Sequence, residues 1–514
     1  MAAQAAERSR KRRRPRREGG GGPRRTDYRR LRLPYPPVAA FSDDQVQAIH
    51  QTSLRVLEEL GMKVLLPEAR ELFAGAGAIV DHDAEMVRIG RDIVESALAT
   101  APPRIEVRGG ASHRDLTLEL GSLVIQPGGG TPHATDRVRG RRPATLEDFR
   151  ELTCLTQHFD VLHMVNPLVE PQDVATHLRH YATMRAQLTL SDKVPFIFAR
   201  GTPQSVDAFR MIQDFRGLTE DAFAAEPWCY TIINTNSPRQ LDIPMAQGLI
   251  DFAHHGQVSI VTPFCLMGAM APVTVAGALT LSHAEALAAI TLTQIAKAGA
   301  PVCYGAFASN VDMKSGAPAF GTPEQVKASL GAGQLARLLG LPWRCAAGCA
   351  ANVNDAQAAH ETQMSAWGSV LAGATVLIHG AGWLEGGLTL SFEKLITDVE
   401  MLNIFAELCT RPGADAGEIA FEALAEVAPG GHFFGAAHTM ARYQSAFYEP
   451  VVADWSNFGT WSEAGSKDAS ERATELWQQL LADFRSPVDA PDRAAALDQF
   501  IERRTAEGGA PPVS

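Results

Sequence analysis

Apolar residues in the middle of the chain form eight short runs, and each run is followed by a longer stretch with helical periodicity. The runs are nearly continuous in apolar character, which is typical of parallel strands that are buried on both faces. The predicted strands are Leu123–Gln126, Val161–Val165, Val194–Ala199, Trp228–Ile233, Val258–Thr262, Val302–Ala306, Trp343–Ala347 and Val376–His379. Regular alternation of strand and helix predicts an α/β fold.

Helix-start and helix-stop signals fall between these runs. Thr145 with Asp148 resembles a capping box, and Thr322 stands before a proline at the first helical position. Glycines close several helices shortly before the next strand, at Gly256, Gly299, Gly340 and Gly373. Long loops after strands and short loops before them predict a (β/α)8 TIM barrel with its active site at the C-terminal strand ends. An open doubly wound sheet is the alternative, but no strand leads into GxGxxG or GxxxxGK[ST].

The pattern changes on both sides of this region. Residues 34–120 predict a small α/β segment, opened by a helix over Ser42–Leu60 with Ser42 and Gln45 as a capping box. Residues 411–514 have mostly helical periodicity. We therefore expect a basic tail over 1–33, the α/β segment over 34–120, the barrel over 121–410 and a helical extension over 411–514. The extension is expected either to cap the barrel or to support a homo-oligomer.

Charge is distributed unevenly along the chain. The net charge is −11, although the segment Arg8–Arg17 is strongly basic and is followed by a glycine run. Such a low-complexity tail is expected to be disordered, with a solubilising role or, alternatively, a nucleic-acid contact. The acidic remainder should repel polyanions, so we expect no nucleic-acid partner. The sequence lacks a secretory h-region and any run of about 18 apolar residues, so we expect no membrane association.

The chain contains seven cysteines, an odd number with wide spacing. Most of them lie in or beside apolar runs, which indicates buried thiols in a reduced, cytoplasmic protein and not a disulfide framework. Cys345 and Cys349 lack a second cysteine or histidine pair at zinc spacing, and no HExxH occurs. We therefore expect no metal site.

The last predicted strand ends at His379 and leads into a glycine-bounded loop that holds Trp383 and Glu385. Residues just beyond the strand ends of a barrel face its pocket. His379 and Glu385 are therefore candidate catalytic residues. The alternatives are a buried core histidine and an ordinary solvent-exposed loop.

The remaining candidates are side chains that suit ligand binding near strand ends. The predicted substrate-binding residues are Tyr230, Asn234, Tyr304, Phe307 and Trp383. Tyr230 alternates with Cys229 along a strand, so a core position is the alternative for its ring.

Four segments carry a resemblance to a known family. They are GAMAPVTVAG at 268–277, NDAQAAHE at 354–361, LAGATVLIHGAGWLE at 371–385 and GHFFGAAH at 431–438. These segments resemble the trimethylamine methyltransferase family, and the likeness extends over residues 30–500. The resemblance implies a barrel that moves a methyl group from an amine to the cob(I)alamin of a separate corrinoid protein. The chain itself would then hold no tightly bound cofactor.

One departure from the family pattern bears on the substrate. Archaeal trimethylamine enzymes carry pyrrolysine near the segment that matches Gly348–Asn354, which here reads GCAANVN. The chain therefore resembles the non-pyrrolysine branch, which includes glycine betaine methyltransferases.

A quaternary amine suits such a chain because it leaves as a neutral tertiary amine and needs no adduct. Aromatic faces and a carboxylate would hold such a cation, and Tyr304, Phe307, Trp383 and Glu385 are of these types. Two alternatives remain open: a barrel that binds a quaternary amine without turnover, and methyl transfer to another acceptor such as tetrahydrofolate.

Overall fold

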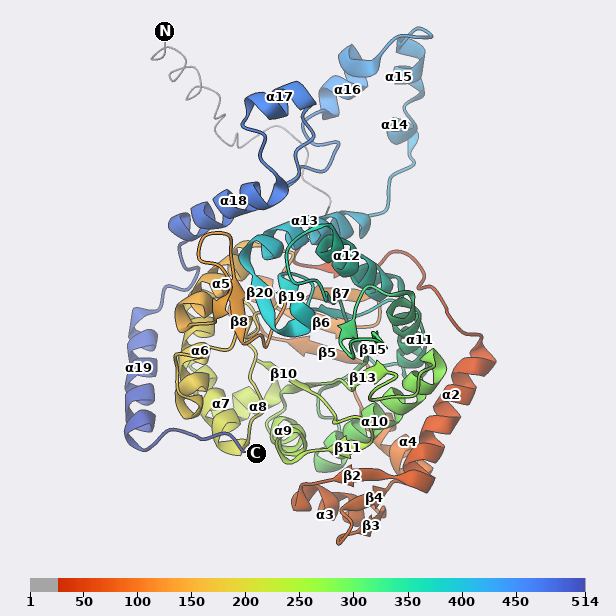
Figure 1. The fold of residues 1–514 in the computed structure, drawn as a ribbon, viewed down its shortest axis with the longest axis vertical. Helices are drawn as coiled ribbons and strands as arrows, with labels where there is room; N and C mark the ends of the chain where they lie inside the picture. Colours follow the sequence, from red (N-terminus) through yellow and green to blue (C-terminus); the bar gives the residue numbers. More distant parts are fainter. Residues whose placement is uncertain (1–25, 514) are drawn as a thin grey trace. The chain divides into compact units, whose positions relative to one another are not determined.

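The computed structural model describes residues 26–513, so most of the expected basic tail lies outside the described residues. The chain divides into a larger unit, Tyr28–Cys409 with Pro450–Ser514, and a smaller unit that contains Thr410–Glu449. The smaller unit contributes the short helices α14 (Ala416–Ile419), α15 (Phe421–Glu426) and α16 (Ala437–Arg442). The larger unit holds the sheet, and Figure 1 shows its helices arranged around that sheet.

The central sheet has the strand order β1-β7-β18-β17-β14-β12-β10. Every pair from β7 to β10 is parallel, and β1 (Leu31–Arg32) is antiparallel to β7. The six parallel strands coincide with predicted strands and are β7 (Ser122–Ile125), β10 (Tyr230–Ile233), β12 (Val258–Val261), β14 (Val302–Gly305), β17 (Trp343–Ala346) and β18 (Val376–Ile378). The predicted α/β fold is confirmed.

The other two predicted strands do not form ladders. Val161–Val165 and Val194–Ala199 contact their neighbours through single parallel bridges, Met164 to Val194 and Phe196 to Tyr230. Pro195 has no amide hydrogen to donate, which limits pairing along its segment. Among residues 26–513 no sheet closes on itself, so the closed TIM barrel is not confirmed.

A helix follows each of the eight segments in the chain. These helices are α5 (Leu146–His158), α6 (Thr176–Leu190), α7 (Thr202–Arg216), α9 (Ile243–His254), α10 (Val275–Ala296), α11 (Pro323–Leu339), α12 (Ala356–Leu371) and α13 (Phe392–Leu408). The predicted helix signals are present, since Thr145 and Asp148 form a capping box and Gly340 ends α11 at φ 69°. A short helix, α8 (Glu220–Ala225), precedes β10.

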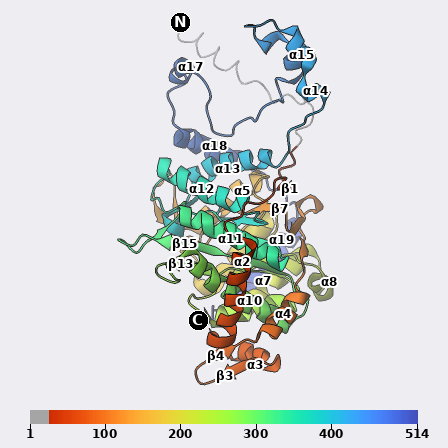
Figure 2. The ribbon, with the colours of Figure 1, turned by 90° about the vertical axis from the view of Figure 1, so that its right-hand side faces the viewer.

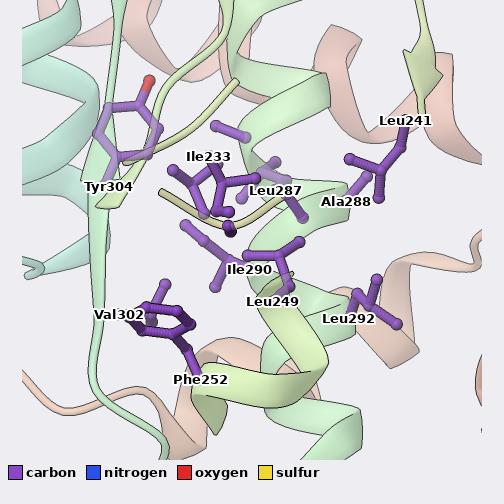
Figure 3. Packing of buried hydrophobic residues seen from close by; sticks show 14 of the residues in the cluster. Ile233, Leu241, Leu249, Phe252, Leu287, Ala288, Ile290, Leu292, Val302 and Tyr304 are labelled. Carbon is purple, nitrogen blue, oxygen red and sulfur yellow. The ribbon is translucent and has the colours of Figure 1, made fainter. Parts of the chain in front are cut away.

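Helix α10 forms the centre of the largest core cluster. By length and composition it could cross a membrane, contrary to the expectation that the chain has no such apolar stretch. Its side chains are largely buried, however, against α2, α4, α9 and α11. Figure 3 shows Leu287 and Ile290 of α10 packed with Leu249 and Phe252 of α9. The apolar character of α10 is therefore that of a core helix.

Residues 34–120 build a small sheet against this core, and one strand from later in the chain, β11, joins its edge. Its strand order is β11-β2-β4-β3, with β2 (Met62–Val64), β3 (Ile79–Asp81), β4 (Met86–Arg88) and β11 (Gln240–Leu241). The helices of the segment are α2 (Asp43–Arg55), α3 (Pro67–Gly75) and α4 (Arg91–Thr100), and a hairpin of β5 (Arg104–Val107) and β6 (Leu116–Glu119) follows. Ser42 and Gln45 form the predicted capping box of α2. Figure 2 shows α2 lying along α10.

Two small sheets order the loops that follow the parallel strands. One contains β13 (Phe264–Met267), β15 (Phe307–Val311) and β16 (Pro318–Ala319). The other contains β8 (His133–Thr135), β9 (Arg142–Pro143), β19 (Trp383–Leu384) and β20 (Thr389–Ser391). Side chains on these loops therefore lie on fixed backbone.

The C-terminal part of the larger unit is helical, with α17 (Phe458–Glu463), α18 (Ala469–Asp483) and α19 (Pro491–Ala506). Helix α18 packs on α13, where the buried Trp477 indole donates to the Glu393 carboxylate at 2.9 Å. Helix α19 packs on α6 and α7.

The packing around α10 predicts a large loss of stability for Ile290→Ala. Ile290 is fully buried, so the substitution leaves a cavity and should lower the free energy of unfolding by about 2–5 kcal/mol. Urea denaturation measures this loss. Ile404→Ala on α13 is the matched control, because Ile404 is 43% exposed and should change stability by no more than about 0.5 kcal/mol. Equal losses in the two variants would contradict the core position of α10.

Candidate active site

A cavity of about 570 Å³ lies among the loops that follow the parallel strands. All eight strand segments contribute to its lining, mostly from their C-terminal parts or the residues just beyond, whereas β17 contributes through its second residue, Arg344. One lining residue from each segment in chain order is Gln126, Asn166, Phe196, Ile232, Phe264, Phe307, Arg344 and His379. This is the place where ligands bind in parallel α/β folds.

Aromatic rings form much of the cavity wall, and they come from Phe196, Phe198, Phe264, Phe307 and Trp383. Phe307 is central, with ring centroids 5.0 Å from Phe264 and 6.2 Å from Trp383. Trp383 is held by backbone that comes very close to its ring. A Cβ added at Gly387 (φ 102°) would lie 2.4 Å from the indole, so only glycine fits there.

His379 lies at the end of β18 with φ 55°, a left-handed conformation that is uncommon outside glycine. Its ring stacks on Trp383, with centroids 4.4 Å apart and an interplanar angle of 9°. Burial lowers the pKa of the imidazole well below its ordinary value, and the charge of Arg344 lowers it further. His379 is therefore a neutral member of the cavity wall near neutral pH. Its Nδ1 is buried without a hydrogen-bond partner.

Arg344 on β17 is the functional candidate that sequence reasoning missed. Its side chain lines the cavity, yet the residue is only 2% exposed. The guanidinium carbon lies 5.1 Å from the centre of the Phe307 ring, and Nε and Nη1 have no hydrogen-bond partner. Burial lowers the pKa of Arg344, but arginine stays charged near neutral pH. The sequence feature that could have indicated Arg344 is its charge within the otherwise apolar run Trp343–Ala347.

Three further aromatic residues were also missed. Phe264 lies two residues beyond the end of a predicted strand, and Phe196 and Phe198 alternate along another. Their period-two placement would have indicated a shared face. Of the predicted residues, the structure brings Asn234, Phe307, His379 and Trp383 together around the cavity.

Tyr304 does not lie at the cavity, and its predicted role in the site is corrected. The ring is fully buried on the outer face of β14, and its hydroxyl lies 3.1 Å from Nδ1 of His283 on α10. Side chains alternate along a strand, so Cys303 joins the inner cluster, whereas Val302 and Tyr304 face α10 (Figure 3).

Tyr230 is also absent from the cavity lining, although it lies on the inner face of its strand. The ring is fully buried and packs on Phe196, with centroids 5.2 Å apart. Its hydroxyl donates to the Val165 carbonyl at 3.0 Å, so its polar atom is satisfied within the protein. The structure gives Tyr230 the core position that was the alternative for it.

Glu385 is absent from the cavity lining, and its predicted catalytic role is corrected as well. Its carboxylate accepts two hydrogen bonds from Arg141, at 2.8 and 2.9 Å. This pairing holds the pKa of Glu385 below its ordinary value. Within residues 26–513, no carboxylate lines the cavity. The acid that was expected to attract a substrate cation is therefore neutralised elsewhere.

The cavity walls supply aromatic faces, one neutral imidazole and arginine side chains. Across the described part of the chain, no group of three or more His, Cys, Asp or Glu side chains is placed to hold a metal ion. All seven cysteines are free. The arrangement is suited to holding and orienting an organic ligand with a cationic group.

Comparison with known proteins identifies the chain as a methyltransferase. Residues 7–509 match the family model described as trimethylamine methyltransferase (MTTB), and the chain belongs to this family. A glycine betaine methyltransferase from Desulfitobacterium hafniense strain Y51 is 31% identical over 471 residues, which cover 91% of this chain and 98% of the relative. A trimethylamine methyltransferase MttB from D. hafniense strain DSM 10664 / DCB-2 is 30% identical over 476 residues, covering 92% and 95%.

Solved structures give a more distant likeness. The monomethylamine methyltransferase MtmB of Methanosarcina barkeri has a TM-score of 0.46 and 9% sequence identity, with 85% of this chain and 92% of that chain covered.

The environment of His379 predicts an imidazole that does not titrate near neutral pH. Because burial and Arg344 both lower its pKa, His379 should remain uncharged when the pH falls from 8 to 6. Histidine-selective ¹⁵N NMR checks this, with His379→Gln identifying the signal by its loss. Half-protonation of His379 at pH 6 or above would contradict the electrostatics described here.

Proposed function

We propose that this enzyme transfers a methyl group from a quaternary amine, such as glycine betaine, to the cob(I)alamin of a separate corrinoid protein. The observation that carries the proposal is the cavity wall of five aromatic side chains at the strand ends. Aromatic faces attract a trimethylammonium group without needing a hydrogen-bond donor on the ligand. The 31% identical relative that is named for glycine betaine supports the same class of substrate.

We also infer that residues 121–410 form a closed (β/α)8 barrel around this cavity. Support comes from the two isolated parallel bridges and from the amide of His163, which donates to the Ile125 carbonyl at 2.8 Å. These contacts connect β7 to Val161–Val165, that segment to Val194–Ala199, and the latter to β10.

The proposed reaction needs positioning more than proton transfer. The bond between nitrogen and the transferred methyl carbon breaks, and its electron pair stays on nitrogen, so that a neutral tertiary amine leaves. The same carbon bonds to the Co(I) centre, which supplies the electron pair for the new bond. No proton moves, and a neutral His379 fits this chemistry because it does not repel the substrate cation. The rings hold the methyl group in the line of attack.

The corrinoid protein is the proposed partner because the acceptor must reach the cavity from outside. Asn234 and Asn236 at the cavity rim are exposed, so the approach is lined by polar side chains. The free thiols suit a reducing, cytoplasmic compartment.

Turnover distinguishes this proposal from its alternatives. We expect purified enzyme to methylate free cob(I)alamin with glycine betaine as donor, detected by the absorbance change of the corrin. Trimethylamine should give no useful rate, because residues 348–354 contain only standard amino acids. Rapid transfer from trimethylamine would contradict the substrate class. Binding of glycine betaine without transfer to cob(I)alamin, a corrinoid protein or tetrahydrofolate would instead favour a binding protein.

The aromatic wall predicts a specific loss of affinity for Trp383→Leu. Leucine fills much of the space but offers no ring face, and a desolvated cation–π contact of about 2 kcal/mol corresponds to about 30-fold in the dissociation constant. Calorimetric titration with glycine betaine measures the change. Tyr304→Phe is the control, since it removes only a hydroxyl that contacts His283 in the core. Equal weakening in both variants would remove Trp383 from the binding wall.

A further inference from the structure

The cavity contains more positive charge than a site for a simple cation should. Its titratable lining side chains, within the described residues, are Arg200, Arg344 and His379. Arg200 has a carboxylate partner, because its guanidinium pairs at 2.9 Å with Glu170, which also binds Arg179, and it lies 4.3 Å from the Phe198 ring centre. His379 is neutral. Among these three side chains, Arg344 is therefore the one that carries a charge without a carboxylate partner.

The burial of Arg344 makes this charge costly to the free protein. Charged side chains are seldom fully buried unless they are paired, because the protein interior replaces water poorly. Two of the three guanidinium nitrogens, Nε and Nη1, are buried and lack any partner. The charged or ionisable neighbours that affect its pKa are the thiols of Cys303 and Cys345, which are themselves buried. The protein therefore supplies no anion to pair with the buried charge of Arg344.

We propose that Arg344 binds the carboxylate of the substrate, and that the enzyme selects quaternary ammonium compounds that carry a carboxylate. The proposal rests on the proposed function and assigns the second half of the same site. A guanidinium presents a planar fork of donors that matches a carboxylate in a bidentate arrangement. Arg344 and the aromatic wall then recognise opposite ends of one zwitterion.

The position of Arg344 against Phe307 explains the selectivity. A quaternary ammonium that enters alone meets both the attractive ring faces and the repulsion of a nearby buried cation. A carboxylate on the same molecule pairs with Arg344 and removes that repulsion. An analogue with a hydroxyl in its place leaves the buried charge unpaired, and sites built for a polar partner discriminate strongly against such analogues.

The test compares three ligands that share a tetraalkylammonium group: glycine betaine, choline and tetramethylammonium. Calorimetric titration of the full-length wild-type enzyme should give at least tenfold tighter binding for glycine betaine than for the other two. Arg344→Met should weaken glycine betaine binding by about 10- to 100-fold, the range expected for a lost charge-assisted hydrogen-bonded pair. Choline binding should stay within about threefold of wild type or become tighter, since the repulsion is gone.

The melting temperature provides a second readout. If Arg344 had a purely structural role, its replacement would lower the melting temperature of the ligand-free protein. Removal of an unpaired buried charge should leave the melting temperature of the ligand-free protein unchanged or raised. Arg344→Lys keeps the charge but loses the fork, so its affinity for glycine betaine should be intermediate. Arg337→Met is the matched control: Arg337 is a partly buried arginine that donates to the Ala372 carbonyl, and it does not line this cavity.

Several results would overturn the assignment. Equal wild-type affinity for the three ligands would refute it even if methyl transfer proceeds. Uniform weakening of all three in Arg344→Met, or the same ligand profile in Arg337→Met, would do so as well. If the wild-type enzyme binds none of the three, the proposed function itself fails, which is a different outcome from failure of Arg344 alone. Should Arg344→Met not fold, the wild-type ligand series and Arg344→Lys still decide the question.

Discussion

The burial of parallel strands on both faces is the constraint on which the rest of this structure depends. A strand covered by helices on one side and by packed side chains on the other must direct successive residues to opposite apolar environments. Along β14 this rule sends Cys303 inward and Tyr304 towards α10. Most residues that reach the cavity lie at the strand ends, where the inner packing stops, such as Phe307 and His379, and Arg344 within β17 is an exception. The composition of the site follows from where each strand ends.

The sequence was sufficient for the positions of six of the eight predicted strands and for several helix ends, because apolar runs, caps and terminal glycines act locally. It was insufficient for side-chain direction at the site. A shift of one residue in register moves a side chain to the other face, and this register is set by neighbouring strands that lie far away in the sequence. Tyr304 was misplaced for that reason. Glu385 was misplaced because its partner, Arg141, comes from a loop 244 residues away.

Arg344 was missed for the opposite reason, since a single charge did not alter the apolar pattern of its strand. The structure places the charge of Arg344 beside His379 and the aromatic lining of the cavity. A buried guanidinium, a neutral imidazole and aromatic rings within one cavity form an environment in which a full charge on a ligand is felt strongly, because little water screens it. Such an arrangement exchanges stability of the free protein for discrimination between ligands, as functional sites commonly do.

The close approach of Gly387 to Trp383 has a consequence for how this enzyme can diverge. A side chain at position 387 would collide with the indole, so the backbone and the ring on that side of the cavity fix each other. Variation in the chemistry that the cavity accepts must then arise from other parts of its lining, such as Phe198 and Phe264, which lie on separate segments of the chain. Descendants of this sequence can adapt to new ligands by exchanging those residues while Gly387 and Trp383 stay fixed.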